Sequence, residues 1–201
     1  ALAQGHEVLA FVRRTGVLRP QPRLRIVQGS LQNPQDLLSA FTGADAVISC
    51  LGQRPSLRAF CLGSHFQRHS LPAIIAAING AQVPRFILQS SFGSGASAAQ
   101  AGWFLRTFLY GLIAKKMFDD KAIAEQALAQ CQANWTAVYP VTLVSRPALP
   151  TAELTPLNTV QQVPGIPLLP FANVALALLQ LLPMQHYAGA KLLLSPPAAW
   201  R

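Results

Sequence analysis

Apolar residues in this chain occur in short runs, and these runs alternate with longer stretches that have the spacing of amphipathic helices. The runs predict strands at residues 7–12, 24–28, 45–51, 85–89, 135–139 and 191–195, and helical patterns cover residues 1–4, 33–41, 62–79, 101–130 and 171–182. Strands that alternate with helices are typical of a doubly wound α/β sheet with right-handed crossovers. We therefore expect one α/β domain over residues 1–201, with a parallel sheet at its centre.

Residues with special backbone preferences mark the ends of these elements. Asn33 and Pro34 predict the N-cap and first residue of a helix. Gly80 is expected to be the C′ residue that ends the helix before it, and Pro72 to break or restart that helix. The long helical stretch is expected to be interrupted near residues 119–120.

One segment departs from this regular alternation. Residues 142–170 contain prolines throughout, and prolines at this density remove backbone donors and favour irregular structure. We expect this proline-rich segment to form a substrate-side lobe within the single domain, or else a mobile loop.

Charge narrows the choice of partners. The net charge is +9, from 16 basic and 7 acidic residues, and five arginines lie within residues 13–25. Such a cluster indicates either an anionic partner or a solvated basic surface. The anion could be a phosphate on a small cofactor, a nucleic acid or a membrane surface. The arginines lack a nucleic-acid motif and interleaved aromatic residues, so we expect no nucleic-acid partner.

Further candidate features are weaker. Three cysteines without C-x-x-C spacing favour a reducing compartment, for which we expect the cytoplasm, with an organelle stroma or matrix as alternatives. No apolar stretch is long enough to span a bilayer. The apolar and basic stretch 103–118 could be a core helix, a lid over a flat substrate, a peripheral membrane helix or a dimer face. His65 and His69 are one turn apart, but Phe66 stands where metalloproteases need glutamate, so we expect no metal site.

The end of the first predicted strand indicates a cofactor. That strand ends in Arg13 and Arg14, and in dinucleotide-binding folds arginine at this place accommodates the 2′-phosphate of NADP, whereas an acid selects NAD. The G-x-G-x-x-G turn that normally precedes this strand is absent. We therefore expect an NADP(H)-binding Rossmann fold that lacks the first strand and glycine-rich turn, either because the chain is a fragment or because the protein lacks that unit.

Several segments together carry a family resemblance. They are HEVLAFVRR at 6–14, IVQGS at 26–30, GADAVISCLG at 43–52, VPRFILQSS at 83–91 and WTAVYP at 135–140. In order and spacing they resemble the atypical short-chain dehydrogenase/reductases, above all the NAD(P)H-binding, NmrA-like group that includes biliverdin-IXβ (flavin) reductase.

This resemblance implies a set of site residues. Ser91 matches the serine beside the nicotinamide, and Lys121 stands where related reductases carry a lysine, so both are expected to be catalytic. The residues that match the family's cofactor-binding positions are Arg13, Arg14, Leu51, Gly52, Ser90, Pro140, Val141 and Thr142. For Lys121 the alternative is a surface ion pair with Glu125 at i,i+4.

Two departures from the family pattern leave the function open. Ser30 replaces the usual acid after Gly29, and no Y-x-x-x-K pair exists, since Tyr110 and Lys115 are five apart. We expect an NADPH-dependent oxidoreductase that reduces a small, flat or hydrophobic acceptor. The alternative is a non-catalytic, NmrA-like protein that senses dinucleotides or takes part in assembly or regulation. The sequence does not determine the oligomeric state.

Overall fold

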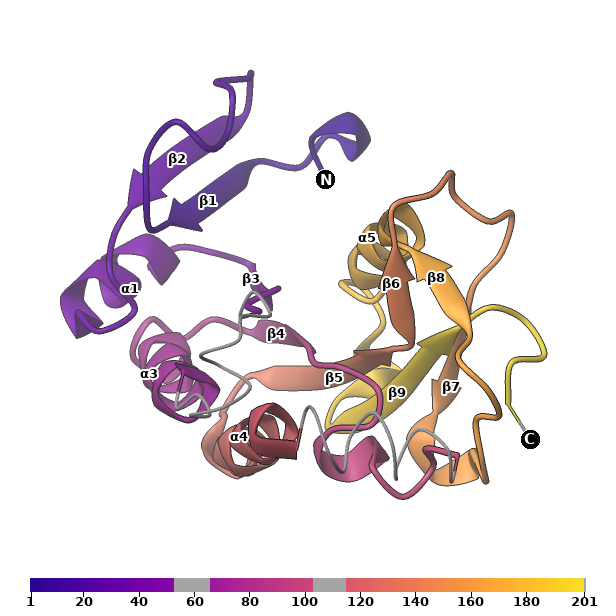
Figure 1. The fold of residues 1–201 in the computed structure, drawn as a ribbon. Coiled ribbons are helices and arrows are strands. Elements are labelled where there is room, and N and C mark those ends of the chain that lie inside the picture. Colours follow the sequence, from indigo (N-terminus) through magenta and orange to yellow (C-terminus); the bar gives the residue numbers. More distant parts are fainter. Residues whose placement is uncertain (53–65, 103–114, 201) are drawn as a thin grey trace.

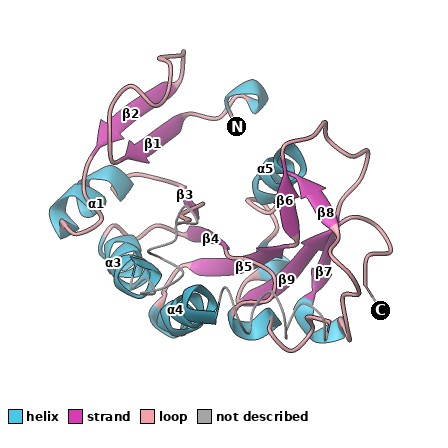
Figure 2. Cartoon of the chain, in the orientation of Figure 1, coloured by secondary structure: helices cyan, strands magenta, loops and turns pink. Residues whose placement is uncertain are grey.

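The computed structural model describes residues 1–52, 66–102 and 115–200. His65 and most of the apolar and basic stretch 103–118 lie outside the described residues. In the described residues the predicted alternation of strands and helices is confirmed (Figure 1, with element types in Figure 2).

The central sheet is five-stranded, in the order β3-β4-β5-β9-β7. Its strands are β3 (Ala46–Ser49), β4 (Arg85–Gln89), β5 (Asn134–Pro140), β9 (Ala190–Ser195) and β7 (Glu153–Pro156). The first four are parallel and β7 is antiparallel to β9. Strand β4 pairs with β3 and β5, and its residues Phe86 and Ile87 are fully buried, as the apolar run predicts.

Two smaller sheets complete the strands. Strands β1 (Val8–Val12) and β2 (Leu24–Gln28) form a parallel pair of their own, as do β6 (Thr142–Val144) and β8 (Leu168–Pro170). The predicted parallel α/β fold is therefore confirmed, but the described strands do not form one continuous sheet.

Helices pack against both sides of the central sheet. Helix α1 (Pro34–Phe41) contacts α3 (Phe66–Gly80), and α3 lies beside α4 (Lys115–Glu125); α5 (Phe171–Gln180) lies on the opposite side, near β6 and β8 (Figure 1). Short 3₁₀ turns are η1 (Leu2–Gln4), η2 (Gly95–Ser97), η4 (Gln126–Gln130), η5 (Leu157–Thr159) and η6 (Gln185–Tyr187). None of the helices in the described part of the chain is long and apolar enough to cross a membrane.

Several predicted helix boundaries are confirmed and others are wrong. Asn33 caps α1 by accepting a hydrogen bond from the Gln35 amide at 3.1 Å, as expected. Gly80, however, is still helical, and the left-handed C′ residue is Gln82 with φ 54°. The Gln82 amide donates to Asn79 and the Val83 amide to Ile78, the two bonds of a Schellman motif.

The expected helix breaks are also wrong. Pro72 lies inside α3 without ending it, and residues 119–120 lie within α4. Ala101, expected to be helical, instead forms a parallel bridge with Val163. That bridge and the strands β7 and β8 show that the proline-rich segment contains ordered pairing, which proline permits at short edge strands.

Candidate active site

The chain that leaves β4 forms the centre of the candidate site. The amides of Ser90 and Phe92 donate to Val138 and Pro140 of β5 at 2.8 and 3.0 Å, so the strand pairing continues past Gln89. Ser90 is buried, whereas Ser91 is half-buried. Ser91 thus lies at the carboxyl end of a central parallel strand, where ligands bind in open α/β sheets.

Lys121 of α4 meets this serine. Its Nζ donates a hydrogen bond to Ser91 Oγ, which joins the two predicted catalytic residues across thirty positions of sequence. Burial lowers the pKa of Lys121, while the negative charge of Glu125 acts in the opposite direction and raises it. The site therefore brings a hydroxyl and a partly desolvated amine into direct contact.

Glu125 is not a surface residue. It is only 8% exposed, and its carboxylate accepts hydrogen bonds from Ser90 Oγ at 2.6 Å and from Tyr139 OH at 2.7 Å. Burial and the Glu125 charge raise the pKa of Tyr139, so the phenol stays protonated and donates. The alternative of a surface ion pair between Lys121 and Glu125 is therefore wrong.

A compact turn after Ser91 leaves room for that carboxylate. Ser94 Oγ donates to the Ser91 carbonyl at 2.7 Å, and Ser97 Oγ accepts from the Gly93 amide at 2.9 Å. Gly95 has φ 50°, and a Cβ atom on it would lie 2.1 Å from Glu125 Oε2. Glycine is required here by both the backbone conformation and the close approach.

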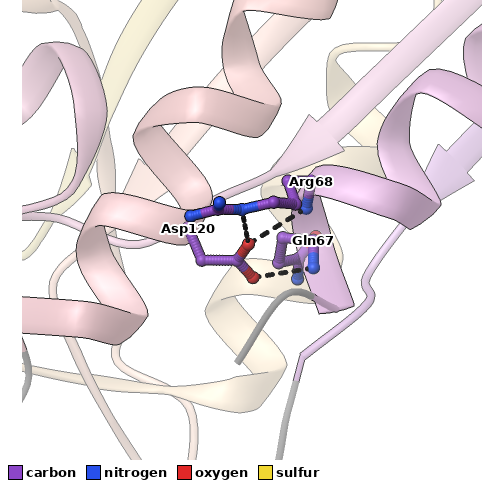
Figure 3. A network of polar contacts seen from close by, with 3 residues as sticks. All are labelled: Gln67, Arg68 and Asp120. Atoms are coloured by element: carbon purple, nitrogen blue, oxygen red, sulfur yellow. Dashed lines mark hydrogen bonds and ion pairs between the residues drawn. The ribbon is translucent and has the colours of Figure 1, made fainter. Parts of the chain in front are cut away.

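A second buried carboxylate joins α4 to α3. Asp120 is 2% exposed, and its two oxygens accept from the Gln67 amide at 2.8 Å, the Arg68 amide at 3.3 Å and Arg68 Nε at 2.9 Å (Figure 3). Gln67 Nε2 also donates to the Leu51 carbonyl at 2.9 Å. Gln67 thus connects Leu51, which follows β3, to Asp120 on the helix that carries Lys121.

Arg13 and Arg14 lie at the end of β1 in the separate two-stranded sheet. Both side chains are exposed, and neither forms an ion pair with any residue in the described ranges. Nearby, the Ser30 amide is bonded to the Asp36 carboxylate at 2.9 Å, so an acid approaches this position from α1 although residue 30 is not acidic.

Comparison with known proteins identifies the family. A family described as NAD(P)H-binding matches residues 1–183. The chain belongs to this NAD(P)H-binding family. No curated protein sequence matches the chain.

Solved structures with the same fold include several reductases of low sequence identity to this chain. A short-chain dehydrogenase/reductase from Veillonella parvula in complex with NADP is 17% identical, with a TM-score of 0.78 over 97% of this chain and 85% of that one. A putative NADH-flavin reductase from Streptococcus pneumoniae is 21% identical, with a TM-score of 0.73 over 97% and 90%. ChuY from Escherichia coli O157:H7, described as an anaerobillin reductase, is 19% identical, with a TM-score of 0.70 over 98% and 88%. At these identities the likeness shows the fold.

Four of the predicted cofactor-binding residues, Arg13, Arg14, Gly52 and Thr142, are exposed, as contacts with an NAD(P)H cofactor require. Two guanidinium groups without a carboxylate partner in the described ranges suit a phosphate. Gly52 lies three residues after β3 and is exposed, as is Thr142, the first residue of β6. The cofactor-binding roles of these residues, and those of Leu51, Pro140 and Val141, stay predictions.

Other predicted positions are buried. Pro140 and Val141 are packed at the end of β5, where the Val141 amide donates to the Leu194 carbonyl at 3.1 Å. The Ser90 hydroxyl is bonded to Glu125, so Ser91 is the serine of the pair that faces Lys121.

Three residues of this site were not predicted as functional: Glu125, Asp120 and Gln67. The signal for Glu125 was its place among small and apolar residues, in Ala122-Ile-Ala-Glu-Gln-Ala-Leu128, where an isolated carboxylate faces either solvent or a buried donor. The i,i+4 spacing of Lys121 and Glu125 does not show whether Glu125 faces solvent or a buried donor, because the spacing is the same in both cases.

Proposed function

We propose that this protein is an NADPH-dependent reductase that acts on a small, flat or hydrophobic acceptor. The observation that carries the proposal is the contact between Lys121 Nζ and Ser91 Oγ at the carboxyl end of β4. A hydroxyl that already accepts from an amine is free to donate its own proton toward a bound acceptor. Membership of the NAD(P)H-binding family supports a redox reaction at that place.

The bound cofactor would supply a hydride, and the protein supplies the remaining needs of the reaction. Reduction of an acceptor takes up one hydride and one proton. Ser91 would donate its hydroxyl proton to the acceptor atom and receive a proton from the Lys121 ammonium group, which solvent then restores. Burial favours loss of that proton because it lowers the pKa of Lys121.

Arg13 and Arg14 would determine the choice of cofactor. Their exposed guanidinium groups can bind the 2′-phosphate that distinguishes NADPH from NADH. We expect tighter binding of NADPH than of NADH by the full-length protein that the gene encodes, and loss of that preference in Arg13→Ala/Arg14→Ala. Titration calorimetry measures both. Arg25→Ala, an exposed arginine on β2, is the matched control.

Ser91→Ala tests the reaction. Turnover of NADPH with FMN or menadione should fall about 10- to 100-fold while NADPH affinity is retained, because the hydroxyl orients and protonates the acceptor. Ser39→Ala, at an exposed position of α1, should behave like the wild type. Unchanged turnover in Ser91→Ala would remove the assigned role. NADPH binding without oxidation by any acceptor would favour a non-catalytic, dinucleotide-sensing protein.

A further inference from the structure

The buried carboxylate of Glu125 holds three parts of the fold together. It lies on α4 and accepts from Ser90 at the end of β4 and from Tyr139 on β5. Both donors are buried hydroxyls, at 6% and 0% exposure, so neither has water as an alternative partner. A buried carboxylate with two such donors is strongly oriented, because rotation of its side chain would break both bonds.

Lys121 lies one helical turn before Glu125 on the same helix. In an α-helix, residues four apart lie on the same face, so a fixed Glu125 also fixes the position from which Lys121 extends. Asp120, next to Lys121, is fixed in turn by its bonds to Gln67 and Arg68 of α3 (Figure 3). The turn of α4 that carries Lys121 is thus held from two directions.

We propose that Glu125 is a positioning residue of the reductase site, which holds the turn of α4 that carries Lys121 so that Nζ meets the Ser91 hydroxyl. This inference rests on the proposed function, since Lys121 and Ser91 act in that reaction. Each oxygen of Glu125 already accepts a hydrogen bond, one from Ser90 and the other from Tyr139. Its effect is exerted through Lys121.

The charge of Glu125 is part of this role. Among the described residues, Lys121 shares α4 with the buried carboxylates Asp120 and Glu125. These two are bonded to Arg68 of α3 and Tyr139 of β5, and the turn after β4 contributes hydroxyls. Asp120 is engaged by Arg68, and the Tyr139 phenol is neutral. Glu125 is therefore the carboxylate that offsets the desolvation of the Lys121 ammonium group.

Competitive acetylation of lysines with acetic anhydride, followed by mass spectrometry across a pH series, measures this directly and needs no turnover. In Glu125→Gln the labelling curve of Lys121 should move to lower pH, because the charge that stabilises the ammonium group is gone. Lys191 on β9 is the internal reference, and Glu7→Gln, at an exposed carboxylate, is the matched control. An unchanged Lys121 curve in folded Glu125→Gln would overturn the proposal.

Turnover gives the second readout. Glu125→Gln should lower kcat about 10- to 100-fold through a misplaced amine and leave the NADPH dissociation constant unchanged. If Glu125→Gln does not fold, Tyr139→Phe replaces it. The freed carboxylate can then turn toward Lys121, so the Lys121 curve should move to higher pH, and an unchanged curve would contradict the inference.

The two proposals fail in different ways. A wild-type protein that reduces no acceptor, but in which Glu125→Gln shifts the Lys121 curve, disproves the reductase and retains only the influence of Glu125 on Lys121. A wild-type protein that reduces acceptors, with unchanged labelling in the variants, disproves the positioning role alone.

Discussion

Gly95→Ala is the sharpest test of how the site is built. The added Cβ atom would lie 2.1 Å from Glu125 Oε2 and 2.7 Å from its Cδ, far inside van der Waals contact. The backbone at Gly95 has φ 50°, a conformation that alanine adopts only with strain. The carboxylate is the end of a side chain, but it cannot move without losing Ser90 or Tyr139.

The expected cost follows from these two effects. The left-handed conformation costs alanine about 1–2 kcal/mol. Displacing a buried carboxylate from one hydrogen bond costs about 1.5–3 kcal/mol. Alanine also lowers the conformational entropy of the unfolded chain, which stabilises the folded protein by about 0.4–1 kcal/mol. We expect the free energy of unfolding to fall by about 2–4 kcal/mol, which is a large part of the 5–15 kcal/mol typical of a domain.

Urea denaturation measures this loss. With a slope of about 2 kcal/mol per M, the unfolding midpoint should fall by about 1–2 M. Gly43→Ala is the matched control, since Gly43 has φ 78° but no heavy atom within 4 Å of the added Cβ. The control carries the backbone strain without the collision. If Gly95→Ala is no less stable than Gly43→Ala, the close approach to Glu125 does not constrain the fold and the reasoning is refuted.

Three further predictions concern buried polar groups. Arg85→Lys should lower the free energy of unfolding by about 2 kcal/mol, because an ammonium group cannot reach all three oxygens that lie 2.6–2.9 Å from the guanidinium. Urea titration measures this loss, and Arg25→Lys, at an exposed position, should change the free energy of unfolding little. Asp120→Asn should speed hydrogen exchange of the two backbone amides at the start of α3 that donate to Asp120. Asp45→Asn, at an exposed carboxylate, should not change their exchange. Equal exchange rates in the two variants would contradict the role of the Asp120 carboxylate. Above pH 10, near the usual pKa of tyrosine, Tyr139 of the unfolded chain loses a proton that the folded protein retains, because its pKa is raised in the fold. The free energy of unfolding should therefore fall with pH more steeply in the wild type than in Tyr139→Phe, by up to about 1.4 kcal/mol per pH unit. Parallel plots of stability against pH for the two proteins would disprove the raised pKa.

Much of the candidate site was predictable because its parts are local. Ser91 follows a strand whose apolar run ends abruptly, and Lys121 lies in a helical stretch, so each could be placed on its element. The family resemblance marked each of them as a candidate catalytic residue, but only the structure shows that Lys121 donates a hydrogen bond to Ser91. The role of Glu125 could not be predicted, since the same i,i+4 spacing describes a surface pair and a buried anchor. Burial decides between them, and burial depends on what packs against the helix.

By itself, the sequence determined the alternation of strands and helices, the cap at Asn33 and the burial of β4. Each of these depends on the periodicity of side chains or on hydrogen bonds between near neighbours. Only the tertiary structure decided that β1 and β2 pair apart from the central sheet, that Gln82 takes the left-handed position expected of Gly80, and that Glu125 faces inward. These features depend on groups that are far apart in the chain, or on the competition between close alternatives that packing resolves. A local pattern therefore places a residue on its element, and the surrounding fold determines what that residue contacts.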